Sequence, residues 1–153
     1  MISIVLSSLV NFFLALIPLL ILVLIMGKGL HPALWFVPIS VVFGILFTLG
    51  VSLAVAAGSV FLTDIIETYR LLLIPWMYLT PIFYPLDIVP ANFVPFLKLN
   101  PMLYLVEYFR TPIYAGVLPD PFTVACAVLV SLLTLIAGWI LFDNLQGSFV
   151  YYV

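Results

Sequence analysis

The chain has 153 residues, of which 67% are hydrophobic and 7% are charged, and its formal net charge is −2. About a quarter of the residues in soluble domains are charged, so this composition excludes an ordinary water-soluble fold and indicates a protein embedded in a lipid bilayer. A slightly negative chain has no electrostatic attraction for nucleic acid, so we expect no nucleic-acid partner.

Long uncharged stretches predict membrane-spanning helices. No charged residue occurs in 32–63, 71–86 or 121–142. A hydrocarbon core about 30 Å thick needs roughly 20 apolar residues in a helix. We therefore expect spans over residues 4–26, about 33–62 and 122–142. The first apolar run has no basic region before it and is too long for a signal peptide.

Small residues recur along the second expected span. Gly50, Ala54 and Gly58 are each four residues apart, so they share one face of a helix and would let another helix approach closely. The alternative is that glycine and alanine are simply common in membrane helices. We expect a helix-packing surface at these three positions.

A polar turn separates the second span from the next helix. Asp64 and Glu67 have the spacing of a capping box, which predicts a helix from residue 65 to about 80. At 1.5 Å per residue this helix is about 24 Å long, so it barely spans a bilayer.

The segment 81–119 is apolar but rich in proline, beginning within the stretch TPIFYPLDIVP. Such a segment is too apolar for a solvated loop, and its prolines break a single helix. Asn100 and Pro101 form a helix-start signature, which predicts a short helix over 102–116. We expect a re-entrant helical hairpin at one membrane surface, since apolar elements this short are more often re-entrant or interfacial than spanning.

Glu107 and Arg110 lie three residues apart in that short helix, on one face. With Asn100 they are candidates for a gate or for stabilising the hairpin. The alternative is an exposed pair that contributes little to stability.

The last expected span begins with a clear helix-start signal. Asp120 is the expected N-cap and Pro121 lies in the first turn, where its missing N–H costs nothing. The fold class that follows is all-α: a polytopic membrane protein of about four transmembrane helices, with a re-entrant helical hairpin before the last span. The closing FDNLQGSFVYYV is expected to be an interfacial tail.

Motifs for chemistry are absent from the sequence. Gly27-Lys28-Gly29 lacks the spacing and the following Ser or Thr of a phosphate-binding loop. One histidine, His31, and one cysteine, Cys126, give no basis for a metal cluster, and we expect no metal or other cofactor. The charged residues fall at expected helix ends or in the segment 81–119, which disfavours ion coupling. The sequence thus predicts a transport subunit and not an enzyme, with energy supplied elsewhere.

Four motifs in unbroken order carry a family resemblance: VFLTDI, PIFYPLDIVP, LNPMLYLVEYFR and the closing FDNLQGSFVYYV. The chain resembles the permease subunit of ABC-2 type polysaccharide exporters, which export O-antigen, teichoic acid and capsular glycans. Members of that family are longer, so this chain is expected to correspond to their C-terminal part, as one transmembrane permease domain over 1–153. Members also usually carry an arginine where this sequence has Thr63.

The resemblance implies a multi-pass protein of the bacterial cytoplasmic (inner) membrane, involved in building the cell envelope. It implies a homodimer of permease chains with separate ATPase subunits, and a glycan or lipid-linked glycan as substrate. It places the turn with Asp64, Glu67 and Arg70 on the cytoplasmic side, as a candidate ATPase contact, whereas helix capping is the simpler interpretation of these residues. The segment 81–119 then becomes extracytoplasmic. Counting positive charges gives the opposite orientation, but Lys98 and Arg110 belong to the expected re-entrant element.

Aromatic side chains cluster around the segment 81–119. Tyr and Trp offer a hydrophobic ring with a hydrogen-bonding group, which suits the apolar faces and hydroxyls of a sugar chain. The candidate substrate-pathway residues are Trp76, Tyr78, Phe83, Tyr84, Tyr104, Tyr108 and Tyr114. The alternative is an interfacial aromatic belt. Alternative functions are an ABC-2 permease for drugs or lipids, or an inactive truncated membrane remnant.

Overall fold

The described part of the molecule is helical. The computed structural model describes Ser7, Val10, Asn11, residues 14–18, Ile21, 32–61, 64–82, Tyr84 and 88–147, and no strand forms among them. The elements in order are a short 3-10 helix η1 (Pro32–Trp35), α2 (Phe36–Phe61), α3 (Ile65–Leu79), α4 (Val94–Lys98), α5 (Pro101–Tyr114) and α6 (Pro121–Gln146).

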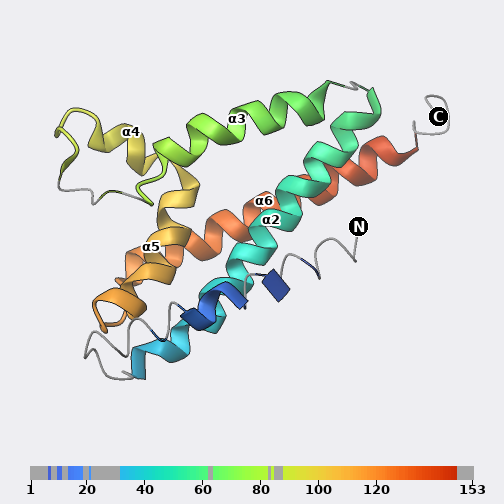
Figure 1. The fold of residues 1–153 in the computed structure, drawn as a ribbon. Helices are drawn as coiled ribbons and strands as arrows, with labels where there is room; N and C mark the ends of the chain where they lie inside the picture. The colour runs from blue at the N-terminus through green and yellow to red at the C-terminus, as the bar shows by residue number, and fades with distance from the viewer. Residues whose placement is uncertain are drawn as a thin grey trace.

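Among the described residues, two helices are long and apolar enough to cross a membrane. One runs from Pro32 to Phe61, including η1, and the other is α6. They lie side by side over much of their length (Figure 1). Most of their surface is not buried within the chain, and large apolar side chains such as Leu133 and Ile136 point outward. Lipid is the solvent that suits such a surface, since it removes apolar area from water.

The helix α3 is separate from this pair along most of its length (Figure 1). None of its 15 residues is buried, and at 1.5 Å per residue it is about 22 Å long. It begins at Ile65 as expected, but the expected capping box is wrong. The Asp64 backbone is helical (φ −82°, ψ −6°) and its side chain makes no cap hydrogen bond. An N-cap side chain needs extended backbone to reach the first turn.

The helix α5 packs against both long helices. Leu105 and Tyr108 form a buried cluster with Phe47 of α2 and Ala127 of α6. The helix ends at Tyr114, two residues before the expected end at residue 116. Gly116 adopts φ 66°, a left-handed conformation that terminates helices and that glycine tolerates without strain.

The last helix begins as its sequence indicates. The Asp120 carboxylate accepts from the Phe122 backbone N–H at 3.2 Å, and Pro121 occupies the first turn. The helix continues to Gln146, so the first residues of the expected interfacial tail are helical. There Gln146 donates from Nε2 to Oδ1 of Asp143 at 2.6 Å.

Some expectations fall outside the described residues. The expected span 4–26 is described only at Ser7, Val10, Asn11, 14–18 and Ile21, which are helical. The described residues also exclude the range 148–153, the candidate pathway residue Phe83, and Lys28, His31 and Thr63.

Candidate functional site

A buried polar junction joins the end of α3 to the start of α5. Asn100 is 4% exposed and is the N-cap of α5, where its Oδ1 accepts from the Met102 backbone N–H at 3.1 Å. Its Nδ2 donates to Thr80 Oγ1 at 2.8 Å and to the Leu79 carbonyl at 3.3 Å. One side chain therefore caps one helix and holds the end of another.

The sequence around Asn100 explains its conformation. Pro101 follows it, and a residue before proline is pushed into extended backbone. Asn100 accordingly has φ −76° and ψ 116°. In that conformation the amide oxygen can reach the first turn of α5, which leaves the amide nitrogen free to reach α3.

Two further bonds complete the junction. Thr80 is 2% exposed and its hydroxyl donates to the Trp76 carbonyl at 3.0 Å. Arg110 of α5 donates from Nη1 to the carbonyl of Pro81 at 3.4 Å. The backbone leaving α3 is therefore held by α5 at residues 79, 80 and 81.

The expected contact between Glu107 and Arg110 does not form. The ion pair recorded among the described residues is instead between Glu67 and Arg70, at 3.0 Å, with both side chains about 70% exposed. Spacing of three residues permits the Glu107 and Arg110 pair, but Arg110 reaches a carbonyl of another segment. Arg110 thus lies at the junction, and Glu107 does not pair with it.

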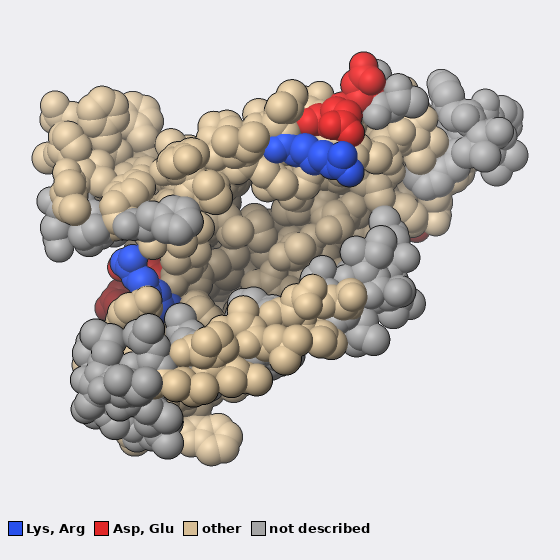
Figure 2. All heavy atoms as spheres, viewed as in Figure 1, with Lys and Arg blue, Asp and Glu red and all other residues tan. Residues whose placement is uncertain are grey.

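Most charged side chains in view gather in two places (Figure 2). One is the start of α3, where Glu67 and Arg70 are exposed, and the other lies near α5. Between these places the surface over α3 carries no Lys, Arg, Asp or Glu in view, and it is hollowed beneath the helix. Asp64 is also exposed, so the three candidate ATPase-contact residues are accessible on one helix end.

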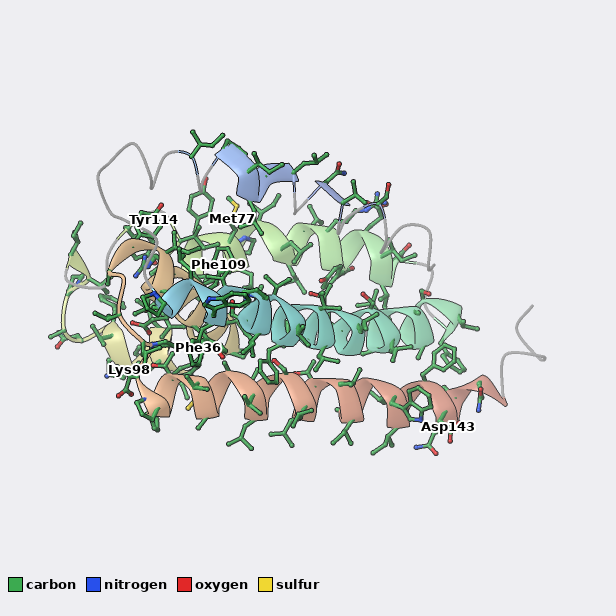
Figure 3. The ribbon with its side chains drawn as sticks, turned by 90° about the horizontal axis from the view of Figure 1, so that it is seen from below. Phe36, Met77, Lys98, Phe109, Tyr114 and Asp143 are labelled. Carbon is green, nitrogen blue, oxygen red and sulfur yellow. The ribbon has the colours of Figure 1, made fainter. Side chains whose placement is uncertain are left out.

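The candidate pathway aromatics divide into exposed and buried groups. Trp76, Tyr78 and Tyr114 are 43%, 64% and 53% exposed. Tyr78 and Tyr84 are also joined, since the Tyr84 hydroxyl donates to the Tyr78 carbonyl at 2.8 Å. Tyr114 lies at the end of α5, on the same side of the molecule as Met77 in Figure 3.

Tyr108 does not belong with the exposed group. It is 2% exposed and lies in the cluster between α2, α5 and α6, with its ring 6.4 Å from that of Phe43. Protein therefore covers the ring of Tyr108, which lies in the core of the described residues and not on their surface. The sequence cannot separate a core aromatic from a surface aromatic on a helix that is apolar on several faces.

Tyr104 is intermediate between the two groups. Its ring meets Phe122 edge-on at 6.3 Å, and its hydroxyl donates to the carbonyl of Lys98 at 2.9 Å. Burial, then the nearby Cys126 and Glu107, raises the pKa of Tyr104 above its usual 10.0. The phenol is therefore neutral at physiological pH and acts as a hydrogen-bonding group, not as an ion.

The three small residues of α2 make different contacts. Gly50 is buried against α6, where a Cβ added to it would lie 2.6 Å from the backbone nitrogen of Leu135. Gly58 meets the start of α3, since an added Cβ would lie 2.7 Å from Cδ1 of Ile65. Ala54 is partly buried.

Sequence reasoning missed two residues, one in the packing of α2 against α6 and one in the junction at Asn100. Gly138 of α6 faces Gly50, and an added Cβ would lie 2.8 Å from the Gly50 carbonyl carbon. Gly138 is the one glycine of the expected span 122–142, and that was the available signal. Thr80 was missed because its role depends on Asn100, 20 residues away.

Comparison with known proteins identifies the family. The sequence model of the ABC-2 type transporter family matches residues 1–114. The chain therefore belongs to the ABC-2 type transporters, a class of membrane protein that agrees with its two apolar helices.

Curated relatives narrow the comparison. The chain is 33% identical over 152 residues to the O-antigen export system permease protein RfbA of Myxococcus xanthus, covering 96% of this chain and 57% of the relative. It is 27% identical over 140 residues to a protein of the same name from Klebsiella pneumoniae, covering 90% of this chain and 53% of that relative. The chain thus spans little more than half the length of these relatives. No solved structure matches it significantly.

Proposed function

We propose that the chain is a membrane-spanning permease subunit of an ABC transporter that exports polysaccharide or lipid-linked glycan across the bacterial cytoplasmic (inner) membrane. The observation that carries this proposal is the match to the ABC-2 family together with relatives named for O-antigen export. The absence of a phosphate-binding loop from the sequence fits a subunit whose energy comes from a separate ATPase.

The proposed architecture adds two elements to the two apolar helices. Residues 4–26 are a third span, and α3, at about 22 Å, is a fourth short one, which makes the subunit multi-pass. The segment 81–119, with α4 and α5, is a re-entrant hairpin on the extracytoplasmic side. Non-helical backbone at membrane depth needs protein cover or water. Protein cover is available beside this segment, because the buried face of α5 packs on α2 and α6.

The proposed substrate path runs past aromatic residues at the end of α3 and beside α5. Trp76, Tyr78 and Tyr114 are exposed there, and Tyr84 and Tyr104 are partly exposed. Aromatic rings suit the apolar faces of sugars. Two copies of the permease would enclose the path. The exposed Asp64, Glu67 and Arg70 at the other end of α3 would face the cytoplasm and contact the ATPase.

The proposal is tested in the native host. Deletion of the gene should abolish surface glycan and leave the lipid-linked precursor inside, and complementation should restore the surface glycan. Affinity purification of the permease should recover an ABC ATPase. Normal surface glycan after deletion would contradict glycan export. Recovery of an ATPase without a glycan defect would favour an ABC-2 permease for drugs or lipids. If deletion causes no glycan defect and no ATPase is recovered, the chain is an inactive remnant.

A further inference from the structure

Within the part of the chain that the structure describes, the helix α3 is attached at its two ends and not along its length. At its start, Ile65 meets Gly58 of α2. At its end, residues 79–81 are held by Asn100 and Arg110. In the middle, Leu71, Leu72 and Ile74 are 68%, 56% and 58% exposed.

The two end attachments differ in kind. The contact between Gly58 and Ile65 is an apolar contact of one side chain, which allows sliding because it is non-directional. The junction at Asn100 is a set of directional hydrogen bonds from its Nδ2 to the Thr80 hydroxyl and to the Leu79 carbonyl. The side chains of Asn100 and Thr80 are 4% and 2% exposed. Buried bonds of this kind are strengthened by the low local dielectric, and they impose a single arrangement on their partners.

We propose that Asn100 is a joint that makes α3 and α5 move as one unit, so that a displacement of the Asp64–Arg70 end of α3 is carried into the segment 81–119. The joint has two parts. Oδ1 of Asn100 fixes the start of α5, and Nδ2 fixes the end of α3. A residue that keeps the first bond and loses the second should separate the two helices without uncapping α5.

Transmission along α3 requires the helix to act as a stiff rod. Intrahelical bonding makes a helix of this length stiff, and Pro75 is the one interruption that α3 contains. The residues after Pro75 rejoin the ladder, because the Thr80 N–H donates to the Trp76 carbonyl at 3.0 Å and the Thr80 hydroxyl binds the same carbonyl. Thr80 therefore both closes the helix and receives Asn100.

The joint is tested by pulsed electron resonance between spin labels on the purified full chain in nanodiscs. Cys126 is first replaced by serine, and labels are placed at the exposed positions Leu72 and Leu99, which report α3 against the start of α5. A reference pair at Val42 and Leu129, both exposed, reports α2 against α6.

Two variants break the joint by different routes. Thr80→Val is nearly isosteric and removes the shorter of the two bonds from Asn100 Nδ2, leaving the 3.3 Å bond to the Leu79 carbonyl. Asn100→Asp keeps the cap acceptor and removes the donor of both bonds. The matched control is Thr111→Val, because the bond that the Thr111 hydroxyl makes to a described residue stays within α5, to the Glu107 carbonyl at 2.8 Å. We expect Thr80→Val and Asn100→Asp to broaden the distance distribution between the labels at 72 and 99, and to leave that of the reference labels at 42 and 129 unchanged. The control variant should change neither distribution.

Two results would overturn the joint. One is a distribution for residues 72 and 99 that stays as narrow as wild type in both variants. The other is equal broadening of both pairs, because that would be general loosening. The transmission step alone depends on the proposed function: glycan export should fall in Thr80→Val but not in Thr111→Val at equal expression. Equal export in both would overturn transmission, whereas a wild type that exports no glycan would contradict the proposed function and leave the distance result to decide the joint.

Discussion

Gly50 of α2 and Gly138 of α6 meet backbone to backbone. A Cβ added to Gly138 would lie 2.8 Å from the carbonyl carbon of Gly50 and 3.0 Å from its Cα. Small residues permit such close approach, and close approach is how helices gain packing energy in lipid, where a hydrophobic driving force between helices is lacking. This crossing fixes the pair against which α5 packs.

A larger side chain at the crossing should force the helices apart. We expect Gly138→Leu to destabilise the protein by about 1–3 kcal/mol or more, because overpacking of a close contact displaces the backbone. Thermal unfolding in detergent, followed by size-exclusion chromatography, measures the effect. Gly44→Leu is the matched control, since an added Cβ there has nothing within 4 Å, and equal melting of the two variants would contradict the crossing.

Tyr108 should behave as a core residue. Replacing it by alanine removes a ring that is 2% exposed, and large-to-small changes of buried aromatic residues cost about 3–5 kcal/mol. Tyr78→Ala is the comparison, because Tyr78 is 64% exposed. The unfolding midpoint should fall for Tyr108→Ala and change little for Tyr78→Ala, and the reverse order would show that the packing described for α5 is wrong.

The ion pair on α3 should matter for binding and not for stability. Glu67 and Arg70 are about 70% exposed, and exposed pairs contribute less than about 1 kcal/mol. Arg70→Glu should therefore leave the unfolding midpoint nearly unchanged while reducing co-purification of the ATPase. Full recovery of the ATPase with this variant would remove the start of α3 from the proposed contact.

Aromatic rings beside the segment 81–119 should support export through their surface. Tyr84→Ala and Tyr104→Ala should lower glycan export at normal expression, because the ring that contacts the sugar is lost. The phenylalanine variants keep the ring and lose the bonds to the carbonyls of Tyr78 and Lys98, so they should retain most export. Wild-type export by the alanine variants would contradict the pathway and leave an aromatic belt as the simpler role.

Local signals predicted the helices well. Asn100 and Pro101, and Asp120 and Pro121, correctly indicated the starts of α5 and α6, because capping depends on residues adjacent in sequence. The Asp64 cap failed because the same spacing is compatible with helical backbone at Asp64.

Long-range contacts were not predictable from spacing. Arg110 was expected to meet Glu107, three residues away, but it bonds the carbonyl of Pro81, 29 residues away. The burial of Tyr108 likewise depends on how α5 turns against α2 and α6. A single sequence indicates which side chains can bond, and the packing of the helices decides which partner is within reach.

The most direct test of the account is water accessibility beside the segment 81–119. A cysteine at Tyr84, in a chain with Cys126 replaced by serine, should react in intact cells with a membrane-impermeant maleimide, and a stalled glycan should slow the reaction. A cysteine at Arg70 should react only after the cells are opened. A Tyr84 cysteine that is unreactive from outside, or that reacts only from the cytoplasm, would contradict a glycan path past this segment.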